Sequence, residues 1–200
     1  IWAPSLEAIF PGGSKANFTI KAPQLLQSNL CGSIREGHFD GVATVIFHLL
    51  RHVKPNFLVL GEKDWQQLVI IKKLIQDLEL PIKIHGIPTV RDIDGLAYSS
   101  RNKYLSQSER KKSLALPQVL NEAAQDAKQG KELNLKELRS SLENKDLQVE
   151  YLELVDPHKL QPIKSRQNLS LLAASVRCGT TRLIDHRFLM TRNPIVAIDG

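Results

Sequence analysis

The chain has 200 residues, 42% of them hydrophobic and 24% charged, which is enough to bury a core and excludes wholesale disorder or a small disulfide-stapled fold. No run approaches the roughly 20 apolar residues that a membrane-spanning helix needs, so we expect a soluble protein without a membrane segment. The 27 Lys and Arg against 21 Asp and Glu give a formal net charge of +6, which favours anionic partners ranging from nucleic acid to a single nucleotide.

The first elements predicted along the chain are a helix and a strand. Residues 1–4, Ile-Trp-Ala-Pro, look like the end of a strand. From Phe39 to Val53 apolar residues recur at helical spacing, which predicts an amphipathic helix that packs on a sheet. The Lys-Pro-Asn sequence at 54–56 stops this helix, and the apolar run at 57–60 predicts a strand buried on both faces.

The same order of elements then repeats. A second helix is predicted from Trp65 to Glu79, with Pro81 marking its end, and residues 82–87 predict a second strand. Helix, strand, helix and strand at this spacing imply right-handed crossovers and a parallel sheet. We therefore expect residues 1–89 to form an α/β domain, with a domain boundary close to Thr89.

The second half of the chain follows a different pattern. A loop rich in Asp, Gly, Ser and Asn runs to about Asn102, and helical stretches follow near residues 108–128 and 135–144. Residues 147–155 alternate in polarity, and they predict a strand with Val149, Tyr151, Glu153 and Val155 on one face. Further strands predicted at 169–176 and 181–188 would complete a small antiparallel sheet. We therefore expect residues 90–190 to form an α+β domain.

Polar residues follow the first predicted strand, where the sequence reads Gly-Glu-Lys-Asp-Trp-Gln-Gln from Gly61 to Gln67. Ligands bind beyond the carboxyl ends of strands in an open parallel sheet, and this composition suits a nucleotide. Lys63 supplies a charge for a phosphate, and Asp64 can either cap the next helix or accept from a ribose hydroxyl. A turn with a helix cap and surface charges explains the same residues, so both interpretations stay open.

A second loop, from Asp94 to Asn102, places two serines beside an arginine just ahead of a helix. Ser hydroxyls and backbone N–H groups donate to phosphate oxygens, and Arg101 can bind them as a fork. An ordinary turn with a helix N-cap explains this loop equally well. Asp92 and Asp94 could assist a metal–nucleotide complex, although solvated loop acids are the interpretation that we favour.

The remaining candidates point to packing rather than to chemistry. His48 and His52 have the i, i+4 spacing of a zinc helix, but no Glu stands between them and no third ligand is apparent, so we expect surface histidines. Cys31 and Cys178 lie far apart without a CxxC motif, which fits a reducing compartment and two small buried or half-buried thiols. We therefore predict a cytoplasmic protein without a metal site.

Four ordered blocks of residues resemble the pantoate–beta-alanine ligase family, also called pantothenate synthetases. Two positions depart from the family's pattern, Tyr98 where Met or Leu is usual and Glu36 where Pro is common. Later segments look like the family's carboxyl-terminal domain, so the resemblance runs from Trp2 to about Asp185. The blocks are residues 37–42 (Gly-His-Phe-Asp-Gly-Val), 61–67, 90–97 (Val-Arg-Asp-Ile-Asp-Gly-Leu-Ala) and 99–105 (Ser-Ser-Arg-Asn-Lys-Tyr-Leu), with the later segments at 151–156 and 179–185.

The resemblance implies an ATP-dependent condensation. Pantoate and ATP give enzyme-bound pantoyl adenylate and pyrophosphate, and the amine of beta-alanine then displaces AMP to form pantothenate. It also implies Mg²⁺ with the nucleotide and a homodimer. Gln67 would hold pantoate, and Lys63 and Arg101 would be catalytic, because fixed cations offset the repulsion when a carboxylate attacks the α-phosphorus. The ATP contacts carried over by position are Gly61, Glu62, Lys63, Asp64, Val90, Tyr98, Ser99, Ser100 and Arg101.

The resemblance also gives expectations for the two ends of the chain. The family has an amino-terminal His-x-Gly-His motif that does not occur in this sequence, so we expect residues 1–89 to be the carboxyl-terminal half of a Rossmann-like nucleotide-binding domain. Residues 90–190 would be the complete lid domain. Residues 191–200 look like a linker and the first strand of a P-loop kinase and resemble the opening of bacterial cytidylate kinase, the alternative being a native tail or a cloning remnant. We therefore expect an interior piece of a bifunctional ligase and kinase that is inactive by itself.

Two rival functions stay open. One is a nucleotidyltransferase-type ligase that activates a different acid. Comparing pyrophosphate exchange with pantoate and with other hydroxy acids would distinguish it from a pantoate ligase. The other is a basic RNA-binding module, which requires tight and strongly salt-dependent RNA binding without a nucleotide preference. The basic residues are scattered, and few aromatic residues lie beside them. We therefore expect no nucleic-acid partner.

Overall fold

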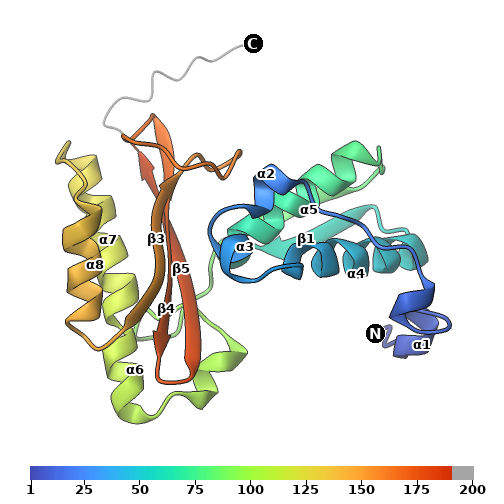
Figure 1. Cartoon of the computed structure of the whole chain (residues 1–200), viewed down its shortest axis with the longest axis horizontal. Helices are drawn as coiled ribbons and strands as arrows, with labels where there is room; N and C mark the ends of the chain where they lie inside the picture. Colours follow the sequence, from blue (N-terminus) through green and yellow to red (C-terminus); the bar gives the residue numbers. More distant parts are fainter. Residues whose placement is uncertain (191–200) are drawn as a thin grey trace. The chain divides into compact units, whose positions relative to one another are not determined.

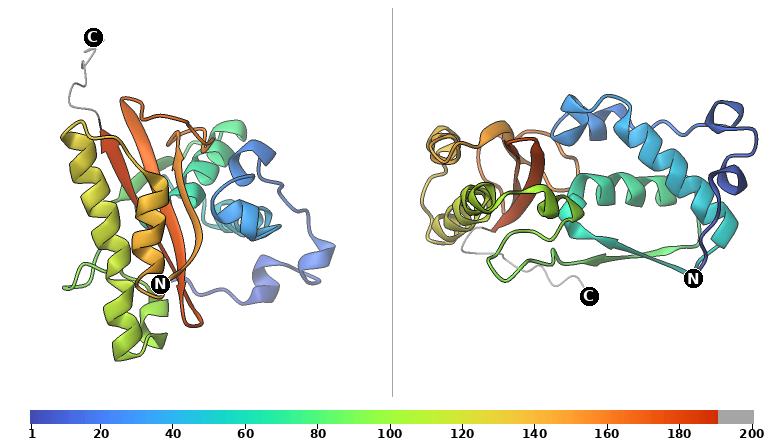
Figure 2. Two further views of the ribbon diagram at one scale, coloured as in Figure 1. Left: turned by 60° about the vertical axis from the view of Figure 1, so that its left-hand side comes forward. Right: turned by 90° about the horizontal axis from the view of Figure 1, so that it is seen from below.

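The computed structural model describes residues 1–190. The chain divides into two compact units, Ile1–Ile87 and Pro88–Gly200, whose elements are labelled in Figure 1 and seen from two further directions in Figure 2. Within residues 1–190, no helix is both long and apolar enough to cross a membrane. The kinase-like strand expected at 191–200 lies outside the described residues.

The first unit is an α/β unit with a parallel two-stranded sheet. Strands β1 and β2 pair in parallel with Phe57 opposite Lys83 and Gly61 opposite Ile87. The predicted helices and strands are present with bounds that shift by a few residues at most. The elements are α1 (Leu6–Ile9), the 3-10 helix η1 (Ser14–Ala16), α2 (Gln24–Gln27), α3 (Cys31–Ile34), α4 (His38–Val53), β1 (Phe57–Gly61), η2 (Glu62–Asp64), α5 (Trp65–Asp77) and β2 (Lys83–Ile87).

The prediction that β1 is buried on both faces is wrong. Helices α4 and α5 pack together over one face of the sheet, where Leu58 and Leu60 join the core. The alternate residues of the strand point to the other face, and Phe57 and Val59 are 57% and 60% exposed. A short apolar run does not show whether both faces of a strand are covered. Residues 1–4 also form no strand, because the first element is α1.

Helix α4 is attached to the irregular segment that precedes it. Thr44 Oγ1 accepts from the backbone N–H of Ile20 at 2.8 Å, and Asp40 Oδ1 accepts from that of Ala22 at 2.8 Å. His48 is buried, with Nε2 3.3 Å from the carbonyl oxygen of Phe18. The expectation of a surface histidine is therefore wrong for His48, because the amino-terminal segment covers the helix face on which it lies, whereas His52 is exposed.

The second unit is α+β, as predicted, with an antiparallel sheet in the order β3-β4-β5. Helices α7 and α8 lie side by side along one face of this sheet (Figure 1) and share one apolar core with it. The elements are η3 (Ser100–Tyr104), α6 (Gln107–Ser113), α7 (Ala115–Lys128), α8 (Leu135–Glu143), β3 (Gln148–Val155), β4 (Leu169–Cys178) and β5 (Thr181–Met190). Among the described residues, Cys31 and Cys178 form no disulfide and both are buried, which confirms the prediction for the two thiols.

A bulge changes the faces of strand β3. The sequence pattern placed Val149 on the same face as Tyr151, but Val149 pairs with Val176 and Tyr151 with Ser175, so Glu150 is an extra residue in the strand. A bulge of this kind shifts the alternation by one residue. Val149 therefore joins the helix-facing core together with Leu152 and Leu154, and that part of the predicted alternation is wrong.

The long helical stretch predicted at 108–128 is divided into α6 and α7. Pro117 lacks a backbone N–H, and in a continuous helix its ring would clash with the carbonyl group of Ser113. Helix α6 ends at Ser113, and Pro117 occupies the first turn of α7, where proline is tolerated. Helix α6 begins with a capping box, in which Ser106 and Glu109 satisfy each other's backbone N–H groups.

We predict that Leu120→Ala will lower the free energy of unfolding by about 3 kcal/mol, because Leu120 of α7 is fully buried in the core of the second unit. Urea denaturation followed by circular dichroism measures the loss. Leu169→Ala is the matched control, because Leu169 is 36% exposed and should lose far less. Equal losses for the two variants would contradict the assignment of this core.

Candidate functional site

The segment from Gly61 to Asp64 lies at the carboxyl end of the parallel sheet. Gly61 is the last residue of β1 and pairs with Ile87, the last residue of β2. The 3-10 helix η2 and helix α5 follow directly. The residues expected to contact ATP in this unit therefore lie at the edge where parallel sheets bind ligands.

Lys63 carries a half-buried charge at this edge. Its side chain is 17% exposed, and its Nζ lies 4.0 Å from Asp64 Oδ2, which is a long ion pair. Asp64 occupies the N-cap position of α5, but its side chain makes no capping hydrogen bond. The helix-cap interpretation of Asp64 is therefore not realised, and its carboxylate is half-exposed.

Glu62 lies against the second strand. A Cβ atom on Gly86 would come within 2.8 Å of Glu62 Oε1, so a side chain at this position would displace the Glu62 carboxylate. Gly86 thereby lets Glu62 pack directly over β2, next to the end of the sheet.

An open hollow of about 670 Å³ lies at the amino-terminal end of α4 and includes Gln67. Arg35 Nη1 and His38 Nε2 lie 2.8 Å apart at its rim. The hollow is lined by Arg35, Glu36, Gly37, His38, Gly41, Val42, Val45, Ile46 and Gln67. Gln67, expected to hold pantoate, therefore shares a cavity with the Gly-His-Phe-Asp-Gly-Val block, which the sequence analysis did not connect to it.

Gln66 has a different role from its neighbour. It is buried, and its Nε2 donates to the carbonyl oxygens of Leu26 and Asn29 at 2.9 Å each. These bonds attach the α2–α3 segment to the start of α5. Nothing in the sequence pointed to this role, because the partners lie about 40 residues away.

In the second unit, residues 90–98 form a closed hairpin. The backbone N–H of Tyr98 donates to the carbonyl oxygen of Val90 at 2.9 Å, and that of Asp92 donates to Leu96 at 2.8 Å. Gly95 takes the positive φ of 91° that the tight turn requires. The hairpin thus brings Val90 and Tyr98, both expected to contact ATP, directly beside each other.

The serine–arginine segment follows this hairpin at once. Ser99 caps the 3-10 helix η3 by accepting from the backbone N–H of Arg101 at 3.2 Å, so the N-cap interpretation holds for Ser99. Ser100 and Arg101 are exposed, and within residues 1–190 the Arg101 guanidinium makes no ion pair. Both side chains are therefore available to an anion.

Asp92 and Asp94 are partly solvated, as expected, but both are also ion-paired, which was not expected. Arg110 of α6 bridges them, with Nη2 2.8 Å from Asp92 Oδ2 and Nε 2.8 Å from Asp94 Oδ2. The hydrogen bonds from Arg110 hold the pKa of Asp94 below its usual range. No group of three His, Cys, Asp or Glu side chains in residues 1–190 could hold a metal ion. These residues do not fit a magnesium site.

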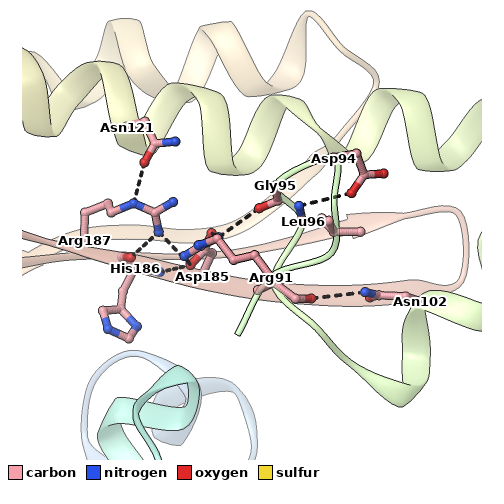
Figure 3. Close-up of polar contacts among 10 residues, drawn as sticks. Arg91, Asp94, Gly95, Leu96, Asn102, Asn121, Asp185, His186 and Arg187 are labelled. Carbon is pink, nitrogen blue, oxygen red and sulfur yellow. Dashed lines mark hydrogen bonds and ion pairs between the residues drawn. The ribbon is translucent and has the colours of Figure 1, made fainter. Parts of the chain in front are cut away.

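A buried carboxylate connects the hairpin to the sheet (Figure 3). Arg91 binds both oxygens of Asp185 in a bidentate pair, at 2.8 and 2.9 Å. Arg187 Nη1 donates to the same carboxylate at 3.0 Å, and its Nε donates to Asn121 of α7. Burial raises the pKa of Asp185, but the hydrogen bonds from Arg91 and the charges of both arginines outweigh burial, so its pKa is lowered overall.

The fold and these two segments define an α/β protein with a parallel-sheet unit and a small α+β unit, each carrying cations suited to a nucleotide. A family model described as pantoate-beta-alanine ligase matches residues 1–188. The chain therefore belongs to the pantoate-beta-alanine ligase family.

Curated relatives carry a longer chain. The chain is 56% identical over 200 residues to a bifunctional pantoate ligase/cytidylate kinase of Prochlorococcus marinus (strain MIT 9303), matching all of this chain and 41% of that protein. A protein with the same description from Synechococcus sp. (strain CC9311) is 54% identical over 202 residues, matching all of this chain and 41% of that protein. The chain thus spans about 41% of the length of these curated relatives.

Solved structures are similar in fold. Pantothenate synthetase from Thermus thermophilus matches 94% of this chain and 68% of its own, with a TM-score of 0.84 and 34% identity. Pantoate-beta-alanine ligase from Francisella tularensis, complexed with beta-gamma ATP and beta-alanine, matches 90% of this chain and 61% of its own, with a TM-score of 0.72 and 31% identity. These structures confirm the expected fold class.

We predict that Asp185→Asn will destabilise the protein by about 3 kcal/mol at neutral pH, because it leaves two partly buried arginines without their counter-charge. A carboxyl group with a lowered folded-state pKa stabilises the fold above its ordinary pKa of about 3.9 and loses that contribution as the pH falls through the folded value. The difference between the variant and the wild type should therefore narrow below about pH 4.

Thermal and urea denaturation across pH 3–7 measure this difference. Asp146→Asn is the matched control, because Asp146 also forms an ion pair, with Lys112, but its side chain is 76% exposed, and little change is expected. A pH-independent loss in Asp185→Asn would show that its charge is not what stabilises the hairpin.

Proposed function

We propose that the full-length protein condenses pantoate with beta-alanine in an ATP-dependent reaction that forms pantothenate. The pantoate carboxylate attacks the α-phosphorus of ATP, which gives pantoyl adenylate and pyrophosphate. The amine of beta-alanine then attacks the acyl carbonyl and releases AMP. The observation that carries the proposal is the half-buried Lys63 at the carboxyl edge of a parallel sheet, in a chain of this family.

The first step needs positive charge. The attacking carboxylate and the triphosphate repel each other, and fixed cations stabilise the charge that moves onto the departing pyrophosphate. Lys63 and Arg101 are the residues that we assign to this task, with Gly61, Glu62, Asp64, Val90, Tyr98, Ser99 and Ser100 as further ATP contacts. Support comes from the partial burial of Lys63, which strengthens its field, and from the absence of an ion-pair partner for Arg101 among the described residues.

The second step needs less help from charge. An acyl adenylate is already activated, so the enzyme has mainly to hold the amine near the carbonyl carbon and to exclude water. The hollow beside Gln67 offers a concave place for the small organic acid, with an amide that can donate to or accept from pantoate. Magnesium would arrive bound to the nucleotide phosphates, because no group of three ligating side chains in the described residues could hold it.

The curated relatives are described as bifunctional pantoate ligases and cytidylate kinases. We propose the same pairing for the full-length protein, in which this chain would supply ligase elements. The homodimer and the cytoplasmic location stay predictions.

We predict that Lys63→Ala in the full-length protein will slow adenylation about 10²-fold or more, because it removes one preorganised charge from the transition state. Pantoate-dependent exchange of pyrophosphate into ATP measures this step directly. Lys73→Ala is the control, because Lys73 is an exposed lysine of the same unit, paired with Asp77 on α5, and its exchange rate should stay near that of the wild type.

A near-normal exchange rate in Lys63→Ala would refute the role of Lys63. Exchange with another hydroxy acid, but not with pantoate, would instead identify a ligase for a different acid. If no acid supports exchange and RNA binds tightly with a steep salt dependence, the RNA-binding alternative would replace both.

We predict that Gln67→Ala will raise the KM for pantoate about tenfold while the KM for ATP stays within about twofold, because Gln67 lies in the hollow and not in the Gly61–Asp64 segment. Initial rates of pyrophosphate exchange at varied pantoate and varied ATP separate the two constants. Gln66→Ala should instead lower the melting temperature, because Gln66 holds two backbone carbonyl groups of the α2–α3 segment. If Gln67→Ala raised only the KM for ATP, Gln67 would be assigned to nucleotide binding and not to pantoate binding.

A further inference from the structure

We propose that Arg110 is a positioning residue for the phosphate-binding segment Ser99–Arg101, which it fixes through Asp92 and Asn102. This inference rests on the proposed function of that segment. Arg110 lies on α6 and is not among the residues assigned to ATP or pantoate.

The first step is the bridge that Arg110 makes. Its guanidinium donates to Asp92 Oδ2 at 2.8 Å and to Asp94 at 2.8 and 3.0 Å. A planar guanidinium can hold two carboxylates in one fixed orientation, which a flexible ammonium group cannot do. Arg110 therefore ties the turn of the 90–98 hairpin to the last turn of α6.

The second step leads from Asp92 to the phosphate-binding segment. Asp92 Oδ2, the same oxygen that Arg110 binds, accepts from Asn102 Nδ2 at 3.1 Å. Asn102 is buried, and Nδ2 also donates to the carbonyl oxygen of Ala97 at 3.1 Å. The backbone N–H of Asn102 in turn donates to the carbonyl oxygen of Ser99 at 3.0 Å.

These bonds form a continuous path from α6 to the exposed side chains of Ser100 and Arg101. At the other end of the hairpin, Arg91 is held separately by Asp185. The hairpin is thus fixed at its base by Arg91, which also donates to the carbonyl oxygen of Gly95 at 3.1 Å, and at the side chains of Asp92 and Asp94 by Arg110. Removing Arg110 would leave the base in place and release the side chain of Asp92, on which Asn102 depends for one of its hydrogen bonds. The phosphate-binding segment would then be less firmly oriented while the sheet stays intact.

A control lies on the same helix. Lys112 of α6 forms an ion pair with Asp146 at 2.9 Å, and it contacts neither the hairpin nor Asn102 in the described residues. Lys112→Ala therefore removes one cation and one ion pair from α6 and leaves the bonds from Arg110 to Asp92 and Asn102 intact. The change in charge is the same as in Arg110→Ala.

The test uses the full-length protein and measures the KM for ATP, the KM for pantoate and the turnover number by pyrophosphate exchange. We expect Arg110→Ala to raise the KM for ATP about tenfold or more, and to lower kcat/KM for ATP accordingly, because displacing phosphate-binding groups by about 1 Å is costly. The KM for pantoate should stay within about twofold, and Lys112→Ala should resemble the wild type. Arg110→Lys should fall between the wild type and Arg110→Ala, since an ammonium can meet only one carboxylate well.

A double-variant cycle tests the path itself. Asp92→Ala should reproduce the defect of Arg110→Ala, and the double variant should be no worse than either single variant, because both interrupt the same path. Asp94→Ala should have a smaller effect, because it leaves the link from Arg110 to Asp92 and Asn102 in place. Additive losses in the Arg110/Asp92 double variant would overturn the path.

The outcomes separate the inference from the proposed function. A wild-type KM for ATP in folded Arg110→Ala, or an equal rise in both KM values, would overturn the positioning role. If Arg110→Ala has no cooperative melting transition, Arg110→Lys decides, and a wild-type KM for ATP in that variant overturns the role. If no acid supports pyrophosphate exchange by the wild-type protein, the proposed function fails. The affinity of the same variants for ATP, measured by calorimetric titration, then decides the role of Arg110.

Discussion

The buried carboxylate of Asp185 is the constraint on which the second unit depends. Its side chain is 1% exposed, so its charge requires partners, and Arg91 and Arg187 supply them from two different segments. Burial works against the ionised form, but the bidentate geometry of Arg91 outweighs that cost. Arg91 is the second residue of the hairpin of residues 90–98, so a buried ion pair ties this hairpin to strand β5.

The arginines around the hairpin divide into two groups. Arg91, Arg110 and Arg187 are all engaged with carboxylates, and each connects segments that are distant in sequence. Arg101 is exposed and has no ion-pair partner within residues 1–190. Arg101 therefore lies on a segment that the ion pairs of the other arginines already hold in place. When an anion binds Arg101, that support needs no rearrangement. The same ion pairs that stabilise the unit thereby also hold the segment that we propose to bind phosphate.

Apolar periodicity and apolar runs predicted the longer helices and the strands, because an element that packs on one face carries that pattern in its own sequence. The short helices α1, α2 and α3 were not predicted. It failed where the outcome depends on something outside the element. The exposed face of β1 depends on what covers the sheet, and the faces of β3 depend on one extra residue, Glu150, seen only in its pairing with β4. His48 is buried because a distant amino-terminal segment packs against it.

The candidate site divides in the same way. Gly61 to Asp64 and Ser99 to Arg101 could be proposed from the sequence because each is a local cluster that follows a predicted element. Arg110 was missed because its two carboxylates lie 16 and 18 residues away, and a loop with acids and a helix with bases suggest solvated charges when read separately. Only the fold shows that Arg110 pairs with these acids. Residues that orient a site depend on such tertiary contacts, so they are harder to predict from sequence than residues that touch a ligand.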